Sequence, residues 1–369
     1  MTKYHYKKLL RSSITAGTVL LALLAGIIVY LTCVSPTRRQ AKKTVTPLAM
    51  TEVLTADQAL KDLDYYYKTV KSRHPAWKDG SKDATENFTL QYQKYIKIFA
   101  GYKENNQTTT VRELFIACWA LANSLHDGHT YIKGLTTAKP EDILGTETIQ
   151  DTVPEFSDDT NQVFFTLNLQ YSTGFLNLKN CVYDEHYKET LETFFEHVNY
   201  YNLKNVAVDL RGNKGGDPKV ALDFIKHLAN VESYRTMGVQ TRYGPLLIKK
   251  DNVTVTNHHE GEQFTGKVWI LTDSTTYSAA MMFAELIQDN SIGHIVGFPS
   301  SSKPEYYGDT ARFQMPDSKL IFTVSYNKYS RIDQSKKDLY LLPDYQSLGE
   351  KAQDTLFDIL KKTLPDQEN

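Results

Sequence analysis

Three short segments of the chain contain residues whose types could support nucleophilic catalysis. The first is Thr276-Tyr277-Ser278-Ala279, which places a serine at the start of an expected helix, 278–289. The free N–H groups and the positive dipole end of a helix start stabilise negative charge that develops on a nearby oxygen. A lone serine at such a position more often caps the helix. The role of Ser278 therefore depends on the residues around it.

The second segment is a glycine-rich turn, Asp209-Leu210-Arg211-Gly212-Asn213-Lys214-Gly215-Gly216, which follows an apolar strand. The paired glycines Gly215 and Gly216 permit backbone conformations that direct N–H groups into open space, as an oxyanion hole requires. A phosphate loop would use similar glycines, but the turn matches neither GxxxxGKS/T nor GxGxxG. By itself, the turn is weak evidence for an oxyanion hole.

The third segment is Leu125-His126-Asp127-Gly128-His129-Thr130. Two histidines three residues apart could bind zinc on a helix, but neither an HExxH motif nor a third ligand accompanies them. We therefore expect no metal and no cofactor. His129 could instead serve as a general base, the commonest role of histidine in catalysis.

The elements that must position these segments follow from hydrophobic periodicity. Helical spacing begins near Thr55, where Thr55-Ala56-Asp57-Gln58 offers a cap, and two more helices are expected at about 82–101 and 109–125. Together they form a helical domain, 51–130. After Thr130 strands and helices alternate, which predicts an α/β core at 131–355 followed by a tail, 356–369. The expected core strands are 163–167, 173–178, 206–210, 268–271 and 294–297, and the expected core helices are 185–201, a helix that opens at Asp217-Pro218, and 278–289.

An uncharged run of twenty-one residues, 14–34, precedes these domains. At about 1.5 Å per residue, a helix of that length spans the roughly 30 Å of a bilayer's hydrocarbon core. The run ends in Tyr30-Leu31-Thr32-Cys33, unlike the small-residue site of a cleaved signal peptide. We expect an uncleaved anchor, with lipid attachment at Cys33 as a minor alternative. Basic residues flank the run on both sides, in the head, 1–13, and in the linker, 35–50. The flanking charges therefore do not predict in which direction the anchor crosses the membrane.

Composition excludes other classes of protein. The formal net charge of −1 gives no electrostatic reason to expect a nucleic-acid partner. The three cysteines, Cys33, Cys118 and Cys181, are odd in number and widely spaced, which is typical of neither a disulfide framework nor a zinc site. We expect Cys118 and Cys181 to pack in the core.

Taken together and in this order, the three segments resemble the carboxyl-terminal processing protease and tricorn-core family of serine peptidases. The resemblance runs from about 55 to 350. Only about 35 residues separate Thr130 from Leu167, too few for the PDZ domain that many processing proteases carry, so the chain looks like the PDZ-less, tricorn-like branch. The matching motifs are Asp127-Gly128-His129-Thr130, Gly174-Phe175-Leu176, Asp209 to Gly216 and Thr276-Tyr277-Ser278-Ala279, with further similarity at His74-Pro75-Ala76, Met315-Pro316-Asp317-Ser318 and Pro343-Asp344.

The resemblance implies an α/β fold: a crotonase-like (ClpP/crotonase-type) β/α core with an N-terminal helical cap domain, preceded here by one transmembrane helix. It also implies that Ser278 is the nucleophile of a serine-type endopeptidase or carboxyl-terminal processing-like hydrolase. The oxyanion hole would use the backbone N–H groups of Ala279 and of Gly215 or Gly216. Peptide bonds would then be hydrolysed through an acyl-enzyme.

The family activates serine in two ways, and the sequence retains candidates for both. In the processing-protease branch a lysine follows the serine by twenty-five positions, which here is Lys303, although its context, Ser300-Ser301-Ser302-Lys303-Pro304, differs. In the tricorn-like branch a histidine is the base, matching His129, and a carboxylate orients it. Asp338 is the nearest candidate for that carboxylate and Asp333 the alternative. We favour His129, because an imidazole is unprotonated at neutral pH whereas a lysine needs burial.

The expected protein is thus a peptidase anchored in the cell membrane by a single span, 14–34, with its catalytic domain extracellular and a peptide or protein as substrate. The sequence does not determine its oligomeric state. One alternative is a catalytically impaired member of the same fold that binds peptide or a wall component. Another is a crotonase-like enzyme that polarises a thioester, which would leave both His129 and the motif around Ser278 unexplained.

Overall fold

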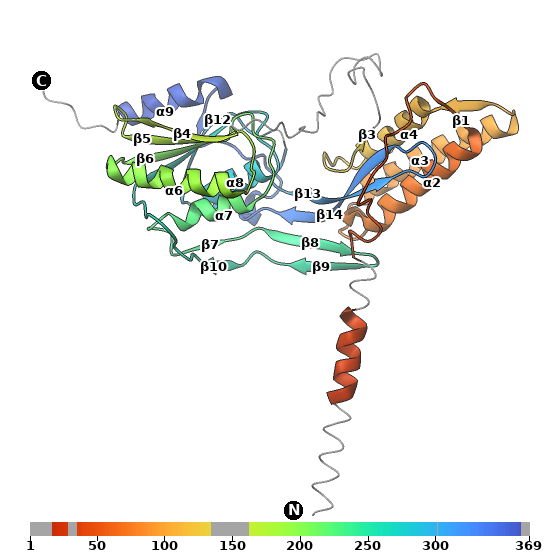
Figure 1. Ribbon diagram of the computed structural model, residues 1–369, viewed down its shortest axis with the longest axis horizontal. Coiled ribbons are helices and arrows are strands. Elements are labelled where there is room, and N and C mark those ends of the chain that lie inside the picture. Colours follow the sequence, from red (N-terminus) through yellow and green to blue (C-terminus); the bar gives the residue numbers. More distant parts are fainter. Residues whose placement is uncertain (1–16, 29–34, 134–161, 301, 363–369) are drawn as a thin grey trace, which may run out of the picture. The chain divides into compact units, whose positions relative to one another are not determined.

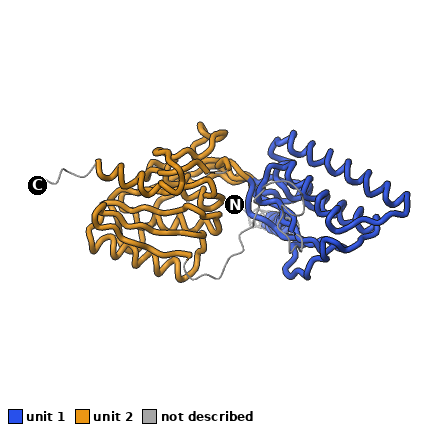
Figure 2. The backbone as a smooth tube through the Cα atoms, turned by 90° about the horizontal axis from the view of Figure 1, so that it is seen from above, with its two compact units in different colours: residues 1–149, 240–248, 307–327 blue, residues 150–239, 249–306, 328–369 orange. Residues whose placement is uncertain are grey.

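The computed structural model describes residues 17–28, 35–133, 162–300 and 302–362. Backbone contacts divide the chain into two compact units (Figure 2). The first unit comprises 1–149, 240–248 and 307–327, and the second comprises 150–239, 249–306 and 328–369. Each unit is described here by itself.

Between residues 35 and 133, which the structure describes, the first unit contains the three helices that the sequence predicted there. They are α2 (Ala56–Arg73), α3 (Lys82–Glu104) and α4 (Val111–Asn123), with a short 3-10 turn, η1 (Pro75–Trp77), after α2. α2 begins with a complete capping box between Thr55 and Gln58. α4 begins with the same device between Thr110 and Glu113. These reciprocal hydrogen bonds satisfy N–H groups that a helix start leaves without partners, which explains where both helices begin.

Strands complete the first unit. β1 (Val53–Thr55) pairs antiparallel with β2 (Thr108–Thr110). A second sheet has the order β13-β14-β8-β9, with β3 on β14. The bounds of its strands are β3 Ile132–Lys133, β8 Gly238–Tyr243, β9 Leu246–Lys250, β13 Tyr306–Gln314 and β14 Ile321–Ser330.

The sequence placed 240–248 and 307–327 in the α/β core, whereas the structure groups them with the helices. The reason is a shared hydrophobic core. Phe313 and Phe322 are buried in one cluster with Tyr66 and Phe88 of the helices. The ring centroids of Tyr66 and Phe322 are 4.9 Å apart, in an edge-to-face contact.

The second unit is an α/β layer structure around a six-stranded sheet with the order β15-β12-β11-β6-β5-β4. Five of these strands are parallel, and β4 is antiparallel to β5. Every residue of β6 is buried, as expected when helices cover both faces of a parallel sheet. The bounds are β4 Val163–Asn168, β5 Thr173–Leu178, β6 Asn205–Asp209, β11 Lys267–Thr272, β12 Gly293–Gly297 and β15 Tyr345–Gln346.

Helices cover the two faces of this sheet (Figure 1). On one face, α6 (Glu185–Tyr200), α7 (Lys219–Lys226) and α8 (Ala279–Asp289) enclose the larger core. On the other face, α9 (Ala352–Lys361) packs on Phe175 and Trp269. The remaining elements are the strand pair β7 (Ser233–Arg235) and β10 (Thr254–Thr256) and the 3-10 turns η2 (Gln334–Lys336) and η3 (Gly349–Lys351).

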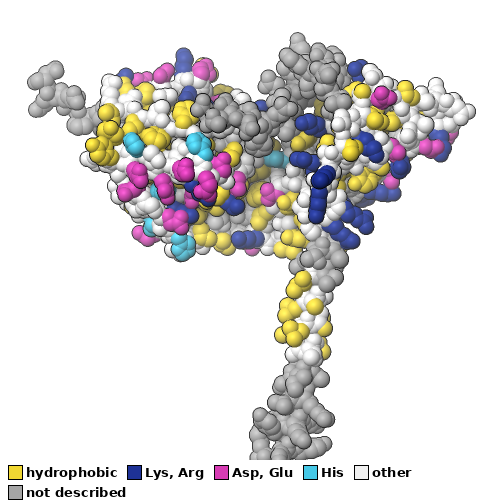
Figure 3. Space-filling view, in the orientation of Figure 1, with side chains coloured by type: hydrophobic (Ala, Val, Ile, Leu, Met, Phe, Trp, Pro, Cys, Tyr) yellow, Lys and Arg dark blue, Asp and Glu magenta, His cyan; other side chains and the backbone are white. Residues whose placement is uncertain are grey.

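The structure describes part of each end of the chain. The expected tail, 356–369, begins inside α9, because the buried Leu356 and Leu360 hold that helix on the sheet. Of the expected anchor, 14–34, only 17–28 lies within the described residues, and it is helical with exposed apolar side chains (Figure 3). Within the described ranges, no helix is both long enough and apolar enough to cross a membrane.

Candidate active site

Ser278 occupies the junction between β11 and α8 in a backbone conformation that serine rarely adopts. Its φ is 53° and its ψ is −125°. A positive φ costs a residue with a Cβ roughly 1–3 kcal/mol, and such strain concentrates at functional sites. The Ser278 side chain makes no capping hydrogen bond to α8. Helix capping therefore does not account for the serine at this strained position, which is partly buried.

The turn that carries Ser278 is fastened to the glycine-rich turn. The fully buried Thr276 donates its hydroxyl to the carbonyl of Leu210 at 2.9 Å and accepts the N–H of Asp273 at 3.0 Å. The N–H of Tyr277 donates to the carbonyl of Asn213 at 3.0 Å. These bonds join the ends of two neighbouring parallel strands, β6 and β11, which is where reactive groups gather in open α/β sheets.

The two predicted oxyanion glycines have different surroundings. Gly215 (φ 104°) is buried, and a Cβ added there would lie 2.7 Å from the Ser278 Cβ and 2.8 Å from the Ala279 nitrogen. Its N–H donates to the Asn213 Oδ1 at 2.8 Å. Gly216 (φ 144°) is exposed. Because the Gly215 N–H already has an acceptor, Gly216 is the better candidate of the pair to bind an oxyanion.

Buried polar contacts hold the glycine turn rigid. The Asn213 side chain is fully buried and donates to the carbonyl of Leu178 at 3.0 Å. Cys181 forms a parallel bridge with Gly216, in which its N–H donates to the Gly215 carbonyl at 3.0 Å. Burial raises the pKa of the Cys181 thiol to about 12, so this cysteine stays protonated and is not a rival nucleophile. Cys118 is likewise buried, as the sequence predicted.

Arg211 of the glycine turn pairs with Asp209. The Arg211 Nε lies 2.8 Å from the Asp209 Oδ1, and the Arg211 Nη2 lies 2.6 Å from the Asp209 Oδ2. This two-point pairing raises the pKa of Arg211 and ties the turn to the end of β6.

His129 belongs to the first unit and Ser278 to the second, so their pairing stays a prediction. The His129 side chain is 19% exposed, and its Nδ1 lies 3.7 Å from the Asp127 Oδ1. The other carboxylate oxygen of Asp127 lies 3.1 Å from the Nε2 of the buried His74. In the sequence, Asp127 and His74 are only parts of matching motifs, which predict no role for either residue.

The remaining candidates are two exposed residues and one that is half-buried, Asp333. Lys303 is exposed, and so is Asp338, which lies in the turn after η2. Asp333 caps η2, accepting hydrogen bonds from Ser335, and hydrogen bonds from Ser335 and Lys336 lower its pKa to about 2. Among the described residues, no group of three His, Cys, Asp or Glu side chains is arranged to bind a metal ion.

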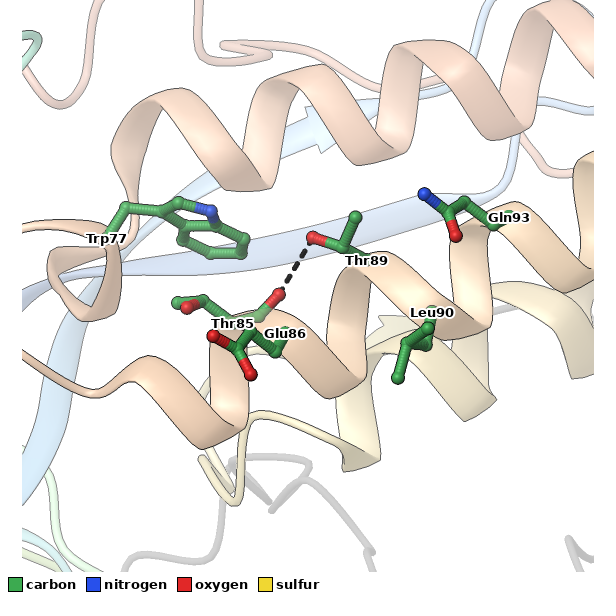
Figure 4. A pocket seen from close by; sticks show the side chains of 6 residues that line it. All are labelled: Trp77, Thr85, Glu86, Thr89, Leu90 and Gln93. Carbon is green, nitrogen blue, oxygen red and sulfur yellow. Dashed lines mark hydrogen bonds between the residues drawn. The ribbon is translucent and has the colours of Figure 1, made fainter.

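A shallow cavity of about 330 Å³ lies in the first unit, beside α3 (Figure 4). Trp77 lines one side, and side chains of α3, including Leu90, line the other. It contains none of the predicted catalytic residues. This cavity therefore does not coincide with the predicted catalytic residues, and the strained turn at Ser278 remains the candidate site.

Solved structures of similar fold exist at low sequence identity. A candidate peptidase from Parabacteroides merdae ATCC 43184 matches with a TM-score of 0.58 and 13% identity, over 84% of this chain and 97% of that chain. Mature CPAF matches with a TM-score of 0.57 and 8% identity, over 84% of this chain and 96% of that chain. Such identities show the fold alone. No curated protein sequence matches the chain.

The sequence of the second unit identifies the family. Residues 172–347 match the model of peptidase family S41. This range contains the glycine turn and the strained Ser278, together with Lys303 and Asp338, whereas His129 lies before it. Through this segment the chain belongs to peptidase family S41, a family of serine peptidases.

Proposed function

We propose that the chain hydrolyses peptide bonds through an acyl-enzyme formed on Ser278. The observation that carries this proposal is the strained conformation of Ser278, at φ 53°, against the rigid glycine turn. Such a conformation lowers the stability of the folded protein. A serine with only a structural role would give no reason to keep it. Membership of a serine peptidase family supports the same residue as nucleophile.

The proposed reaction has two halves. The Ser278 Oγ attacks the carbonyl carbon of the scissile bond while His129 takes the hydroxyl proton, and the carbonyl oxygen becomes an oxyanion that the N–H groups of Ala279 and Gly216 stabilise. The C–N bond then breaks, and the leaving amine takes the proton from His129. A water molecule attacks the resulting ester by the same route in reverse, releasing the carboxylic acid and restoring Ser278.

His129 is the proposed base and Lys303 the alternative. A lysine must be desolvated to accept a proton at neutral pH, and the Lys303 side chain is exposed. An imidazole needs no such desolvation. We infer that the chain follows the histidine-dependent branch and acts as an endopeptidase or processing-type peptidase on peptide or protein substrates.

A serine-directed fluorophosphonate tests this function directly, because the reagent reacts only with an activated serine. We expect one adduct per chain, located by mass spectrometry on the peptide that contains Ser278, and no adduct in Ser278→Ala. A folded wild-type protein that takes up no reagent would instead support a catalytically impaired member of the fold that binds peptide or wall material.

We propose further that the protein is held in the cell membrane by the segment 14–34, with the catalytic domain outside the cell. The support is the length and apolarity of this run in the sequence. Full-length protein should remain with the membrane fraction, and protease added to intact cells should digest the domain. Removal of residues 1–34 should release a soluble protein. Recovery of the full-length protein in the soluble fraction, or its protection until lysis, would contradict this localisation.

A further inference from the structure

The first unit contains a buried carboxylate between two histidines. The Asp127 side chain is 1% exposed, and that of His74 is fully buried. The His74 Nε2 lies 3.1 Å from the Asp127 Oδ2. The His74 Nδ1 accepts the N–H of Ala76 at 3.2 Å, which places the imidazole proton on Nε2. His74 therefore donates a hydrogen bond to Asp127 and occupies one of its two oxygens.

The other oxygen of Asp127 faces His129. The Asp127 Oδ1 accepts the backbone N–H of His129 at 2.9 Å and lies 3.7 Å from the His129 Nδ1. The latter distance is longer than a hydrogen bond, but catalytic hydrogen bonds in ligand-free enzymes are often long and shorten when substrate binds. With Nδ1 directed at a carboxylate, Nε2 is the nitrogen that accepts the proton of a serine hydroxyl.

We propose that Asp127, rather than Asp338, is the carboxylate that orients His129, and that His74 acts through Asp127 as a second positioning residue. This inference rests on the proposed function of His129 as the general base. The proposal gives Asp127 and His74 roles that the sequence motifs did not predict.

Charge and local structure support this assignment. Burial by itself raises the pKa of Asp127, but the polar interactions with the neighbouring His129 and His74 side chains outweigh it and lower the pKa overall. The carboxylate is thus held ionised in a site that excludes water, where its field on an imidazole is strongest. Asp338, by comparison, is exposed, so solvent weakens its field.

The frame around the cluster fixes its geometry. The His129 carbonyl accepts the hydroxyl of Thr323 at 2.7 Å, and the Thr130 hydroxyl accepts the N–H of Ser325 at 2.9 Å. Both bonds attach this segment to β14. On the other side of the cluster, the His74 carbonyl accepts a hydrogen bond from the Arg242 Nη1 at 3.2 Å. These bonds hold the backbone on both sides of the cluster, which suits a positioning role, because an orienting carboxylate must keep one direction.

The test compares Asp127→Asn with Asp338→Asn in the full-length chain. Both substitutions keep the side-chain shape and remove the charge. We expect Asp127→Asn to lower the rate of fluorophosphonate labelling at Ser278 by about 10²–10⁴-fold, the range for loss of general-base catalysis. With fluorescein-labelled casein, kcat should fall and KM should change little. Asp338→Asn should label at nearly the wild-type rate.

A second readout is the tautomer of His129, and its decisive measurement uses the wild-type protein alone. In wild-type protein labelled with ¹⁵N-histidine, the neutral form of His129 should carry its proton on Nδ1, and Asp127→Asn should disturb that tautomer. A carboxylate with a purely structural role would leave the tautomer unchanged. Observation of the Nε2–H tautomer for His129 in the wild type would overturn the proposal, even if Asp127→Asn failed to fold.

Two controls separate this inference from the proposed function. If Ser278→Ala and His129→Ala are inactive while Asp338→Asn is also inactive and Asp127→Asn is active, the inference fails and the proposed function stands. If His129→Ala keeps wild-type labelling, the base assignment fails and the inference fails with it.

Discussion

Gly215 lies against Ser278 so closely that no side chain fits between them. A Cβ on Gly215 would be 2.7 Å from the Ser278 Cβ, well inside van der Waals contact. The backbone of the glycine turn therefore forms the wall behind the nucleophile, and the position of one residue depends on the identity of the other.

Gly215→Ala should accordingly abolish activity. The alanine methyl would push the nucleophile turn away, and a displacement of about 1 Å in a catalytic group can cost 10²-fold in rate. Gly212→Ala is the matched control, because Gly212 also has a positive φ, of 79°, but a Cβ there meets no atom within 4 Å. Fluorophosphonate labelling rates compare the two. Equal losses in both variants would show that backbone strain, rather than the contact with Ser278, is responsible.

Ser278→Gly should inactivate the protein and stabilise it. Glycine adopts a positive φ without the penalty that a Cβ imposes, so relief of the strain should add about 1 kcal/mol to the free energy of unfolding. Ser278→Ala, which keeps the Cβ, should also be inactive but should change stability by less than about 1 kcal/mol. Urea denaturation measures both values. A destabilised Ser278→Gly would mean that the observed conformation is not strained.

His129→Ala should lower kcat by about 10²–10⁴-fold, the usual contribution of a general base. Lys303→Ala should have little effect, because the exposed Lys303 is not desolvated. An inactive Lys303→Ala beside an active His129→Ala would move the protein into the serine–lysine branch and keep Ser278 as nucleophile.

Arg331→Ala should be strongly destabilising. Arg331 and Asp289 form a buried pair, with the Arg331 Nε 2.9 Å from the Asp289 Oδ2 and side chains 1% and 0% exposed. Removal of one partner leaves a buried charge uncompensated, which costs about 3–5 kcal/mol. Lys336→Ala is the control, since Lys336 is 4.0 Å from the same carboxylate but about half exposed. It should cost less than about 0.5 kcal/mol by urea denaturation. Similar losses of unfolding free energy in the two variants would show that the buried Arg331–Asp289 pair does not stabilise the fold in this way.

Glu285→Gln should stabilise the protein in alkaline solution. Glu285 is fully buried, and burial raises its pKa well above the usual range. The folded state then binds a proton that the unfolded state has lost, so this carboxyl makes stability fall as pH rises above its unfolded pKa. Glutamine is neutral at every pH and removes that fall. The free energy of unfolding of Glu285→Gln, relative to that of the wild type, should be larger at pH 8 than at pH 5. An equal difference at both pH values would rule out the proton linkage.

Much of the fold follows from local sequence pattern. Capping boxes at Thr55 and Thr110 mark the starts of α2 and α4, and the apolar run 206–210 predicts the buried strand β6. These signals are readable because caps and periodicity depend on residues only a few positions apart. The serine and glycine motifs are local for the same reason, and they carry the resemblance to the peptidase family by themselves.

Contacts between distant residues were decided by the tertiary structure. His74 and Asp127 are 53 positions apart, and their pairing depends on how α2 and the segment after α4 pack. Strands at 240–248 and 307–327 belong with the helices because apolar side chains such as Phe322 complete that core. The sequence by itself determined the helices of the first unit, most strands and helices around the larger sheet, the family motifs and the candidate nucleophile, but not the strands β8, β9, β13 and β14. Packing alone decided which carboxylate is buried beside His129, because burial and ionisation depend on neighbours that no local pattern specifies.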